Sequence, residues 1–468
     1  MNNQKKGRES WGSNFGFLMA AIGSAVGLGN LWGFPYKCGA NGGFAFILLY
    51  LVLVVFTGYI LIMTELALGR ATGQSIIPAY KKASDGKLTF VGIFSAIAPF
   101  LILGFYSYLG GYSIKYTVAN LGDIFNANWG VKGVDGSEFF LNLVGNIPES
   151  ILYTIIFLAI TIFVVARGVD SGIEVFNKFA MPALTILLII VVIRSCTLPG
   201  AGGGLSFLFK PDLTVFKGSG WITVLSAAGG QMFFSLSLGM GILVTYGSYM
   251  SKSENISVNG IVIPIADTFI ALLASLAIMP AVFSFGMEPG AGPGLLFMTL
   301  QSVFNSMGVA GPIFGFFFYL LVVLAALTSS VSLLEAIISS FIDRDLIKGK
   351  ANTRIKWAVI FGLLTMAEGI LVAYDALGSN LPLVFGQPDI LDAFDLIAEG
   401  ILMPIAAFLT TIYFGWFKKD FLPAEIKADG SAFKTEGFYR FCIKFLAPLF
   451  TFFVLLGQIN SFFQLGWF

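Results

Sequence analysis

Histidine is absent from this 468-residue chain, and only 11% of its residues are charged. Without histidine the chain lacks the commonest metal ligand and general base of proteins. The three cysteines are scattered and show neither metal-binding nor disulfide spacing: Cys38, Cys196 and Cys442. No HExxH motif is present, and no acid pair accompanies a plausible nucleophile. These absences argue against an enzyme, and they leave carboxylates as the side chains for any proton coupling.

What the chain has in excess is apolar sequence. Hydrophobic residues make up 57% of it, and its mean hydropathy is +0.86. Soluble domains carry roughly 25% charged residues, so this composition indicates an integral membrane protein. Lipid leaves helices and closed barrels as the spanning structures, and the long apolar runs favour helices. The net charge of +1 gives no reason to expect a nucleic-acid partner.

Runs of about 20 apolar residues predict individual membrane-spanning helices. A glycine- and proline-rich loop, Glu288–Gly294, follows the seventh span, and the short apolar piece after it predicts a surface or re-entrant hairpin. The eleven predicted spans are Trp11–Cys38, Phe44–Gly69, Leu88–Leu121, Ile151–Ala166, Ile173–Cys196, Trp221–Tyr249, Val258–Phe285, Gly311–Ile342, Lys356–Ala373, Phe394–Phe417 and Phe438–Phe463.

Two of these spans contain helix breaks. The first is interrupted around Ser24–Asn30, where two glycines bracket a leucine, and the sixth around Phe233–Gly241. Lipid cannot satisfy a freed N–H or C=O group, so such backbone is tolerated only where it lines a cavity or binds something. Paired broken helices in two halves of one chain predict the central binding site of a transporter.

The distribution of positive charge predicts the orientation in the membrane. Lysines and arginines cluster before the first span and after the second, eighth and tenth spans, and few fall on the other side. By the positive-inside rule the N-terminus is cytoplasmic. An odd number of spans then places the C-terminus outside. We expect a multi-pass protein of the bacterial cytoplasmic membrane, with no cleavable signal peptide.

Small hydroxyl residues are concentrated in the stretch Leu324–Ser332. One interpretation is close helix packing, which serine and alanine permit. The other is cation binding, because hydroxyl and carbonyl oxygens are hard, neutral ligands suited to a monovalent ion. No cluster of carboxylates of the kind that calcium or magnesium needs accompanies them.

Several acidic residues fall inside predicted spans. Asp267 lies in an apolar span, and a buried carboxylate is expensive unless it is paired or protonated. An ion-pathway role is favoured over a structural acid held neutral. Glu65 is placed either at the cytoplasmic end of its span or against the broken backbone of the first span. Three further intramembrane acids receive no role: Glu335, Glu368 and Glu399.

Three stretches together resemble the neurotransmitter:sodium symporters, specifically their bacterial amino-acid branch. The stretch from Trp11 to Gly43, with Gly27-Leu28-Gly29-Asn30 at its centre, is similar to the family's first-helix signature. Gln231–Gly239 and Leu327–Ser330 are similar to its sixth- and eighth-helix motifs. The resemblance runs from Trp11 to about the end of the chain.

The resemblance implies an all-α, LeuT-like fold with two inverted five-helix repeats, discontinuous helices 1 and 6, and one extra C-terminal helix. Helices 1–5 and 6–10 would provide alternating access to a site at the middle of the membrane. A twelfth helix, present in many members, would be absent. The implied divisions are residues 1–10 (cytoplasmic segment), 11–200 (first repeat), 201–220 (extracellular loop), 221–420 (second repeat), 421–437 (cytoplasmic loop) and 438–468 (eleventh helix).

The resemblance also implies the ligands of two sodium ions. The first site would use the Ala25 carbonyl, Asn30, Ser235, Asp267 and the substrate's own carboxylate, which gives coupling a physical reason. The second would use the carbonyls of Gly23, Val26 and Ala325 with the hydroxyls of Thr328 and Ser329. No organic cofactor is expected.

The implied substrate site receives the amino-acid carboxylate on backbone amides of the first break and on Tyr106. Phe234 would close over the substrate as an outer lid. The implied substrate-binding residues are Ala25, Gly27, Leu28, Gly29, Ile102, Tyr106, Phe234, Ser235, Ser237, Met240, Ser329 and Leu333. The implied gate residues are Arg8, Tyr249, Asp343, Asp395 and Phe234.

Three departures from the family pattern carry predictions. Gly27 stands where the monoamine branch has an aspartate, which favours an amino acid with its own carboxylate. Asp267 stands where many members have asparagine, and its charge could replace the chloride that Tyr50, Gln231 and Ser235 would otherwise outline. Gly33 replaces a usual outer-gate arginine that would face Asp395. Either Lys37 pairs with Asp395 instead, or the outer gate is weaker.

The sequence therefore predicts a sodium-coupled, chloride-independent symporter of a neutral, hydrophobic or aromatic L-amino acid. One alternative is proton-coupled symport in the same fold, with Asp267 as the proton carrier. Another is an amino-acid sensor or channel that binds its ligand without accumulating it. The expected partners are the amino acid, sodium ions and the lipid bilayer, with no nucleic acid.

Overall fold

The computed structural model describes residues 9–287, 289, 295–350 and 353–467. Within these ranges every helix-or-strand element is a helix, and the only β-type pairing is an isolated bridge between Val384 and Gln387. The predicted all-α fold class is therefore confirmed. Several long helices contain a π-helical turn that is continuous with the flanking α-helix. These turns are labelled η, as are three short 3-10 helices, η4, η6 and η9.

The first half of the described chain contains fourteen helical segments. They are α1 (Asn14–Ala25), η1 (Gly29–Gly33), α2 (Phe34–Ala40), α3 (Phe44–Leu53), η2 (Val54–Gly58), α4 (Tyr59–Thr72), α5 (Ile76–Ala83), α6 (Thr89–Ile124), α7 (Gly136–Gly145), α8 (Ile147–Ala166), η3 (Val169–Glu174), α9 (Val175–Cys196), α10 (Ala201–Phe209) and η4 (Thr214–Phe216).

The second half begins with the two parts of the sixth span. Its segments are α11 (Gly220–Ser235), α12 (Ile242–Gly247), α13 (Ile256–Ser284), η5 (Leu295–Thr299), α14 (Leu300–Ser306), η6 (Gly308–Ala310), α15 (Gly311–Ile347), α16 (Arg354–Asp375), α17 (Ile390–Asp395), η7 (Leu396–Leu402), α18 (Met403–Ile412), η8 (Tyr413–Phe417), α19 (Phe421–Ile426), η9 (Lys427–Asp429), α20 (Glu436–Phe441), η10 (Cys442–Leu446) and α21 (Ala447–Phe462).

Both predicted helix breaks are present. The helical stretches Asn14–Ala25 and Gly29–Ala40 meet at an angle of 46°. The second break separates α11 from α12, and three of its residues have positive φ: Ser237, Gly239 and Gly241. A Cβ atom on Gly239 would lie 2.4 Å from the Met403 carbonyl oxygen, so glycine is required both for its φ and for this close approach.

Nine helices of the described chain are long and apolar enough to cross a membrane, and the bent first pair makes a tenth. The remaining predicted span, Trp221–Tyr249, corresponds to α11 and α12. These contain 16 and six residues, and each is too short to cross alone. The segment after residues 288–294 is η5 and α14, which pack against α7 and α15, and as predicted it is too short to span the membrane.

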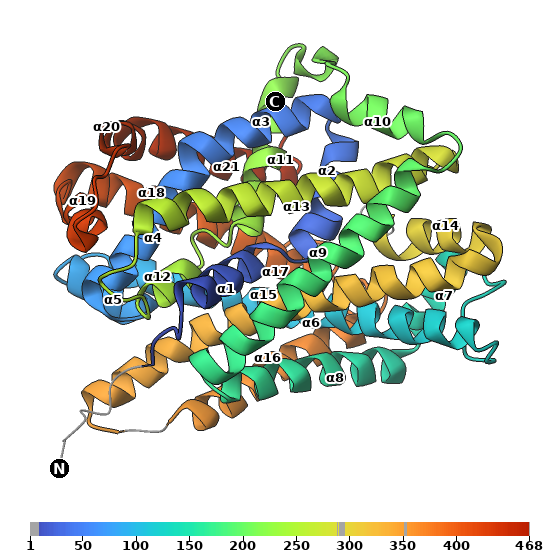
Figure 1. Cartoon of the computed structure of the whole chain (residues 1–468), viewed down its shortest axis with the longest axis horizontal. Helices are drawn as coiled ribbons and strands as arrows, with labels where there is room; N and C mark the ends of the chain where they lie inside the picture. Colours follow the sequence, from blue (N-terminus) through green and yellow to red (C-terminus); the bar gives the residue numbers. More distant parts are fainter. Residues whose placement is uncertain (1–8, 288, 290–294, 351–352, 468) are drawn as a thin grey trace.

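The long helices α6, α13 and α15 run across the molecule in Figure 1, with α5, α19 and α20 at one end and α7, α10 and α14 at the other. α6 packs along α15, α8 packs on α6 and α16, and α9 packs on α13. The first broken helix lies among them, because α1 contacts α9, α13 and α15. The backbone breaks are thus held inside a bundle rather than exposed to lipid.

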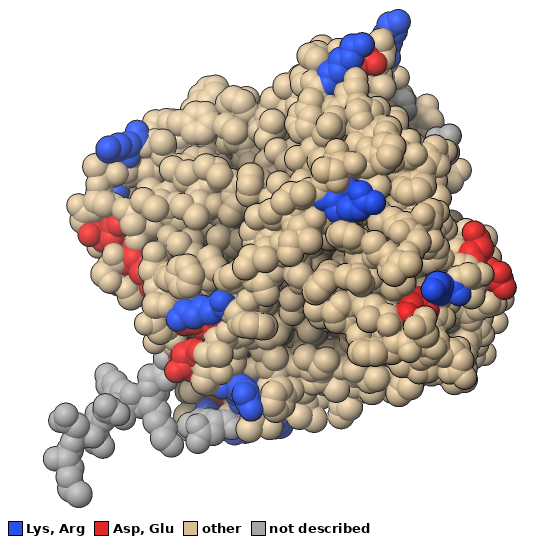
Figure 2. All heavy atoms as spheres, turned by 45° about the vertical axis from the view of Figure 1, so that its right-hand side comes forward, with Lys and Arg blue, Asp and Glu red and all other residues tan. Residues whose placement is uncertain are grey.

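The outer surface agrees with a lipid environment. Large apolar side chains on several long helices are exposed, including Phe163, Phe179 and Leu363. Figure 2 shows that charged side chains are sparse on the face in view and that most lie toward its edges. A surface of this kind is stable in a bilayer and would aggregate in water.

Candidate functional site

Hydroxyl groups of α15 meet the break of the first helix. Thr328 Oγ1 lies 2.9 Å from the Ala325 carbonyl oxygen and 3.4 Å from that of Val26. Ser329 Oγ lies 3.4 Å from the Gly23 carbonyl oxygen. These hydroxyl and carbonyl oxygens come from two distant parts of the sequence, and the structure brings them together at the first helix break. They are the oxygens predicted to hold the second sodium ion.

Asp267 occupies the other side of the break and is fully buried. Asn30 Nδ2 donates to its carboxylate over 2.7 Å, the Tyr50 hydroxyl over 3.0 Å, and Ser235 Oγ over 3.0 Å. Within the described residues Asp267 forms no ion pair, so its charge is stabilised by dipoles alone. A bound cation would supply the counter-charge that a buried carboxylate in this state lacks. The Asn30 amide oxygen accepts the Gly27 N–H over 3.0 Å, which ties this group to the first break.

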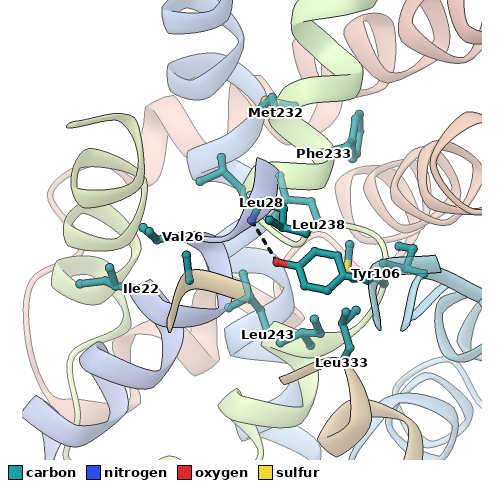
Figure 3. Packing of buried hydrophobic residues seen from close by; sticks show 14 of the residues in the cluster. Ile22, Val26, Leu28, Tyr106, Met232, Phe233, Leu238, Leu243 and Leu333 are labelled. Atoms are coloured by element: carbon teal, nitrogen blue, oxygen red, sulfur yellow. Dashed lines mark hydrogen bonds between the residues drawn. The ribbon is translucent and has the colours of Figure 1, made fainter. Parts of the chain in front are cut away.

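A cavity lies between the two helix breaks. The Tyr106 hydroxyl reaches across it and accepts the Leu28 N–H over 3.0 Å, as Figure 3 shows. Leu28 contributes this backbone group, and neither its side chain nor Ser235 lines the cavity. The lining residues are Ser24, Ala25, Gly27, Gly29, Ile102, Tyr106, Phe234, Ser237, Met240, Ile242, Ser329 and Leu333.

Two lining residues, Ser24 and Ile242, were missed by sequence reasoning. Ser24 lies within the predicted break, and its hydroxyl is 3.3 Å from that of Ser237 on the other broken helix. Ile242 is the first residue of α12. Both adjoin a break, so proximity to the break motifs was the available signal.

Gly27 gives the cavity its depth. A Cβ atom at this position would lie 2.3 Å from Ser329 Oγ and 2.6 Å from the Tyr106 hydroxyl oxygen. A larger residue there would fill the space in which the first helix break, α6 and α15 meet. The absence of a side chain therefore leaves room for a ligand against the exposed backbone.

Phe234 separates this cavity from a larger one. It lines the small cavity, of about 20 Å³, and also an outer vestibule of about 520 Å³. Gln231 lies beside it and donates from Nε2 to the Gly29 carbonyl over 2.8 Å, which links α11 to the first break. Phe234 therefore lies between the two cavities.

Glu65 corrects a prediction. It is buried in α4, and its Oε1 atom accepts the Gly239 N–H over 2.8 Å. Glu65 therefore bonds the broken backbone of the sixth span, neither that of the first span nor the cytoplasmic surface. The sequence showed that exposed backbone needs a partner, but it did not show which of the two breaks Glu65 faces.

This contact makes a testable prediction. Replacing Glu65 by alanine leaves the Gly239 N–H without an acceptor, which costs about 1–3 kcal/mol for a buried donor. We expect a lower thermal unfolding midpoint in detergent and weaker sodium-dependent substrate binding. Glu65→Gln keeps an oxygen acceptor and serves as the matched control. Equal behaviour of the two variants would show that this hydrogen bond does not support the break.

The outer gate also differs from prediction. Lys37 does not form its ion pair with Asp395, because its Nζ atom lies 2.8 Å from Glu399 Oε1. Glu399 is one helical turn beyond Asp395, in the segment that continues the same helix. Glu399, unassigned from sequence, is the direct partner of the cation.

Among the predicted inner-gate residues, Arg8 lies outside the described residues. Tyr249 donates from its hydroxyl to Glu335 over 2.6 Å, and Glu335 forms an ion pair with Arg354, also over 2.6 Å. Arg354 contacts Glu9 at 2.6 Å as well, so this network ties α15 and α16 to the N-terminal segment. Asp343 accepts both the N–H and the hydroxyl of Ser75.

Sequence analysis gave Glu335 no role and used Arg354 only as a positive charge. Apolar periodicity cannot reveal an ion pair between adjacent helices, so no sequence signal pointed to this one. Glu368, the third unassigned acid, lies on α16 beside Gly104 of α6. A Cβ atom on Gly104 would lie 2.9 Å from the Cβ atom of Glu368.

Residues 8–131 and 139–467 match the sequence profile of the family described as "Sodium:neurotransmitter symporter family". The chain belongs to this family. It is 37% identical to the uncharacterized sodium-dependent transporter YhdH of Bacillus subtilis over 96% of this chain and 97% of that protein. It is 33% identical to an uncharacterized sodium-dependent transporter of Haemophilus influenzae over 98% and 100% of the two chains.

A solved structure extends the likeness to three dimensions. The crystal structure of MhsT in complex with L-phenylalanine superposes with a TM-score of 0.87 at 36% identity, covering 97% of this symporter and 100% of that chain. The predicted family and LeuT-like fold are thereby confirmed. The protein is a sodium-dependent transporter with many membrane spans, and the expectation that it is not an enzyme agrees with its family and its relatives.

Proposed function

We propose that this symporter couples the inward movement of sodium to the uptake of a neutral, hydrophobic or aromatic L-amino acid, without a chloride requirement. The observation that carries the proposal is the convergence of the Thr328 and Ser329 hydroxyls with the carbonyls of the first break, opposite the buried Asp267. Oxygen groups around backbone without helix partners form a site for small cations.

Two sodium ions are proposed. The first would be held by the Ala25 carbonyl, Asn30, Ser235 and Asp267, together with the substrate carboxylate. The second would be held by the carbonyls and hydroxyls contributed by Gly23, Val26, Ala325, Thr328 and Ser329. In the structure the hydroxyls of Thr328 and Ser329 satisfy those carbonyls themselves, a role that a bound ion would take over. No organic cofactor is proposed.

The substrate class is supported by the composition of the small cavity. Its side-chain wall is apolar, formed by Ile102, Phe234, Met240, Ile242 and Leu333, with Ser24 and Ser237 at the breaks. A charged side chain would find no counter-ion there. The bound L-phenylalanine of MhsT agrees with this class. The cavity of about 20 Å³ has to widen to hold an amino acid, and Phe234 is the residue placed to move.

Chloride independence is supported by the surroundings of Asp267. The hydroxyls of Tyr50 and Ser235, which would outline a chloride site, both donate to the Asp267 carboxylate. Gln231, the third residue of that outline, is buried on α11 and donates to the Gly29 carbonyl. A fixed carboxylate at this position would supply the negative charge that a chloride ion supplies elsewhere.

The remaining topology is proposed from the same features. The two broken helices stand at corresponding positions in residues 11–200 and 221–420, which supports the division into inverted repeats. We place the protein in the bacterial cytoplasmic membrane with its N-terminus inside and its C-terminus outside. Phe234 would act as the outer lid, and Tyr249 with Asp343 and Arg8 as the inner gate.

Removal of the Tyr106 hydroxyl tests the proposed substrate site. Tyr106 accepts the Leu28 N–H and is proposed to donate to the substrate carboxylate. A hydrogen bond to a charged group contributes about 1.5–3 kcal/mol, so Tyr106→Phe should weaken amino-acid binding about 10- to 100-fold. Equilibrium binding of a labelled amino acid in saturating sodium measures this. Tyr108→Phe, whose hydroxyl bonds Tyr112 at 2.7 Å, is the control. Unchanged affinity in Tyr106→Phe would remove it from the site.

Uptake of a labelled amino-acid panel into proteoliposomes tests the proposed substrate class. We expect large neutral amino acids to be accumulated and lysine and glutamate to be excluded. Replacing sodium by choline at fixed pH separates sodium coupling from proton coupling through Asp267. Binding without concentrative uptake would instead indicate a sensor. Accumulation of charged amino acids would contradict the proposal.

A further inference from the structure

The outer vestibule is a site in its own right. It lies beyond Phe234 and is bounded by η1 and α2, by α11, by α17 with η7, and by α21. Its volume of about 520 Å³ exceeds that of the cavity between the helix breaks. Gly33 contributes no side chain to its wall.

Acidic side chains outnumber basic ones on this wall. Asp392, Asp395 and Glu399 line the vestibule, and Lys37 is the one lysine or arginine among its described lining residues. Lys37 is paired with Glu399. Asp395 forms no ion pair within the described part of the chain. One lysine therefore faces three carboxylates on this wall, and the wall favours a further positive charge.

A neutral oxygen ligand lies on the same wall. Gln231 is fully buried, and donation from its Nε2 atom to the Gly29 carbonyl fixes which end of the amide is oxygen. The amide oxygen points toward Gly33, since a Cβ atom there would lie 2.8 Å from it. This oxygen has no hydrogen-bond partner among the described residues. A buried acceptor is costly when unpaired, so this orphaned oxygen indicates a ligand in the space beside Gly33.

These groups lie together. Glu399 Oε1 would be 2.9 Å from a Cβ atom on Gly230, the residue before Gln231, so α11 and η7 bring the amide and the carboxylates onto one surface. We propose that the vestibule binds a monovalent cation, held by Gln231 and Asp395 with support from Glu399, in the space beside Gly33. The site is separate from the two proposed central sodium sites and does not depend on the proposed substrate.

The residues of the wall favour a monovalent cation over a divalent one. A divalent ion needs several carboxylates around one point. Within the described residues, no group of three acidic, histidine or cysteine side chains is arranged to hold a metal ion. Sodium and a primary ammonium group share a single positive charge and a preference for oxygen partners. Either could occupy the site, and the two are distinguished by experiment.

The test is binding of ²²Na⁺ and of ¹⁴C-methylammonium, measured separately on the purified full-length protein. Gly33→Arg places a tethered guanidinium in the vestibule and should remove one equivalent of bound cation. Asp392→Asn removes a lining charge outside the proposed ligand set and should retain it. All three proteins keep the central sites, so the difference between them reports the vestibule alone. Asp395→Asn should weaken the same component at least about 10-fold and provides a second variant if Gly33→Arg fails to fold.

Each result decides the matter. A difference seen only with ²²Na⁺ identifies sodium as the ligand, and one seen only with methylammonium identifies an amine. Either result, or a difference seen with both probes, supports the site. Equal binding of both probes by wild type, Gly33→Arg and Asp395→Asn overturns the proposal.

Discussion

The double substitution Thr328→Val with Ser329→Ala is expected to abolish sodium-driven uptake while leaving the protein folded. Valine matches the shape of threonine without its hydroxyl, and alanine removes only the serine oxygen. The change deletes both side-chain ligands of the proposed second sodium site. Each lost contact to an ion costs about 1.5–3 kcal/mol, so sodium affinity should fall at least about 100-fold. Sodium titration of substrate binding and of uptake measures this loss.

The matched control for this double variant is Ser330→Ala. Ser330 neighbours the pair on α15, but its hydroxyl bonds the Leu327 carbonyl and Thr161, away from the first break. We expect sodium dependence close to that of wild type in the control. If the double variant transports as wild type does, the second sodium site is wrong and the α15 hydroxyls serve helix packing.

Substitution of Asp267 by asparagine is expected to convert a chloride-independent transporter into one stimulated by chloride. Asparagine has nearly the same shape, but it removes the negative charge that Asn30, Tyr50 and Ser235 surround. Without chloride the first sodium ion loses its protein counter-charge, so sodium affinity should fall. Added chloride should raise uptake at least about 10-fold, equivalent to about 1.4 kcal/mol. Uptake at matched sodium concentrations in chloride and gluconate buffers measures the effect.

Asp267→Glu retains the charge and is the control for that experiment. It should remain insensitive to chloride even if the longer side chain lowers the transport rate. Unchanged sodium and chloride responses in Asp267→Asn would remove this carboxylate from the coupling mechanism and leave it a structural role.

Sequence reasoning reached the central site because its chemistry is local. Gly27-Leu28-Gly29-Asn30 breaks a helix wherever it stands, and the positive φ of Ser237 and Gly239 confirms the second break as a real irregularity. The resemblance then brought Thr328 and Asp267 to the first break, and the structure gathers both groups there. Boundaries of the spans agree within a few residues, since apolar length fixes where a helix can cross.

What the sequence could not predict were contacts between helices. Glu65 was known to need a partner, but its choice of Gly239 depends on how α4 packs against α12. An ion pair between Lys37 and Asp395 was one of two alternatives, yet the long Lys37 side chain reaches Glu399. The Arg354 network joins three distant segments by ion pairs that no periodicity encodes. In each case packing angle and side-chain reach decided the partner.

The most direct test of the account is the accumulation of labelled phenylalanine in proteoliposomes with an inward sodium gradient, in buffer free of chloride. The account predicts concentrative uptake that collapses when sodium is equal on both sides or replaced by choline. Uptake that requires chloride, or that proceeds unchanged without sodium, would contradict it.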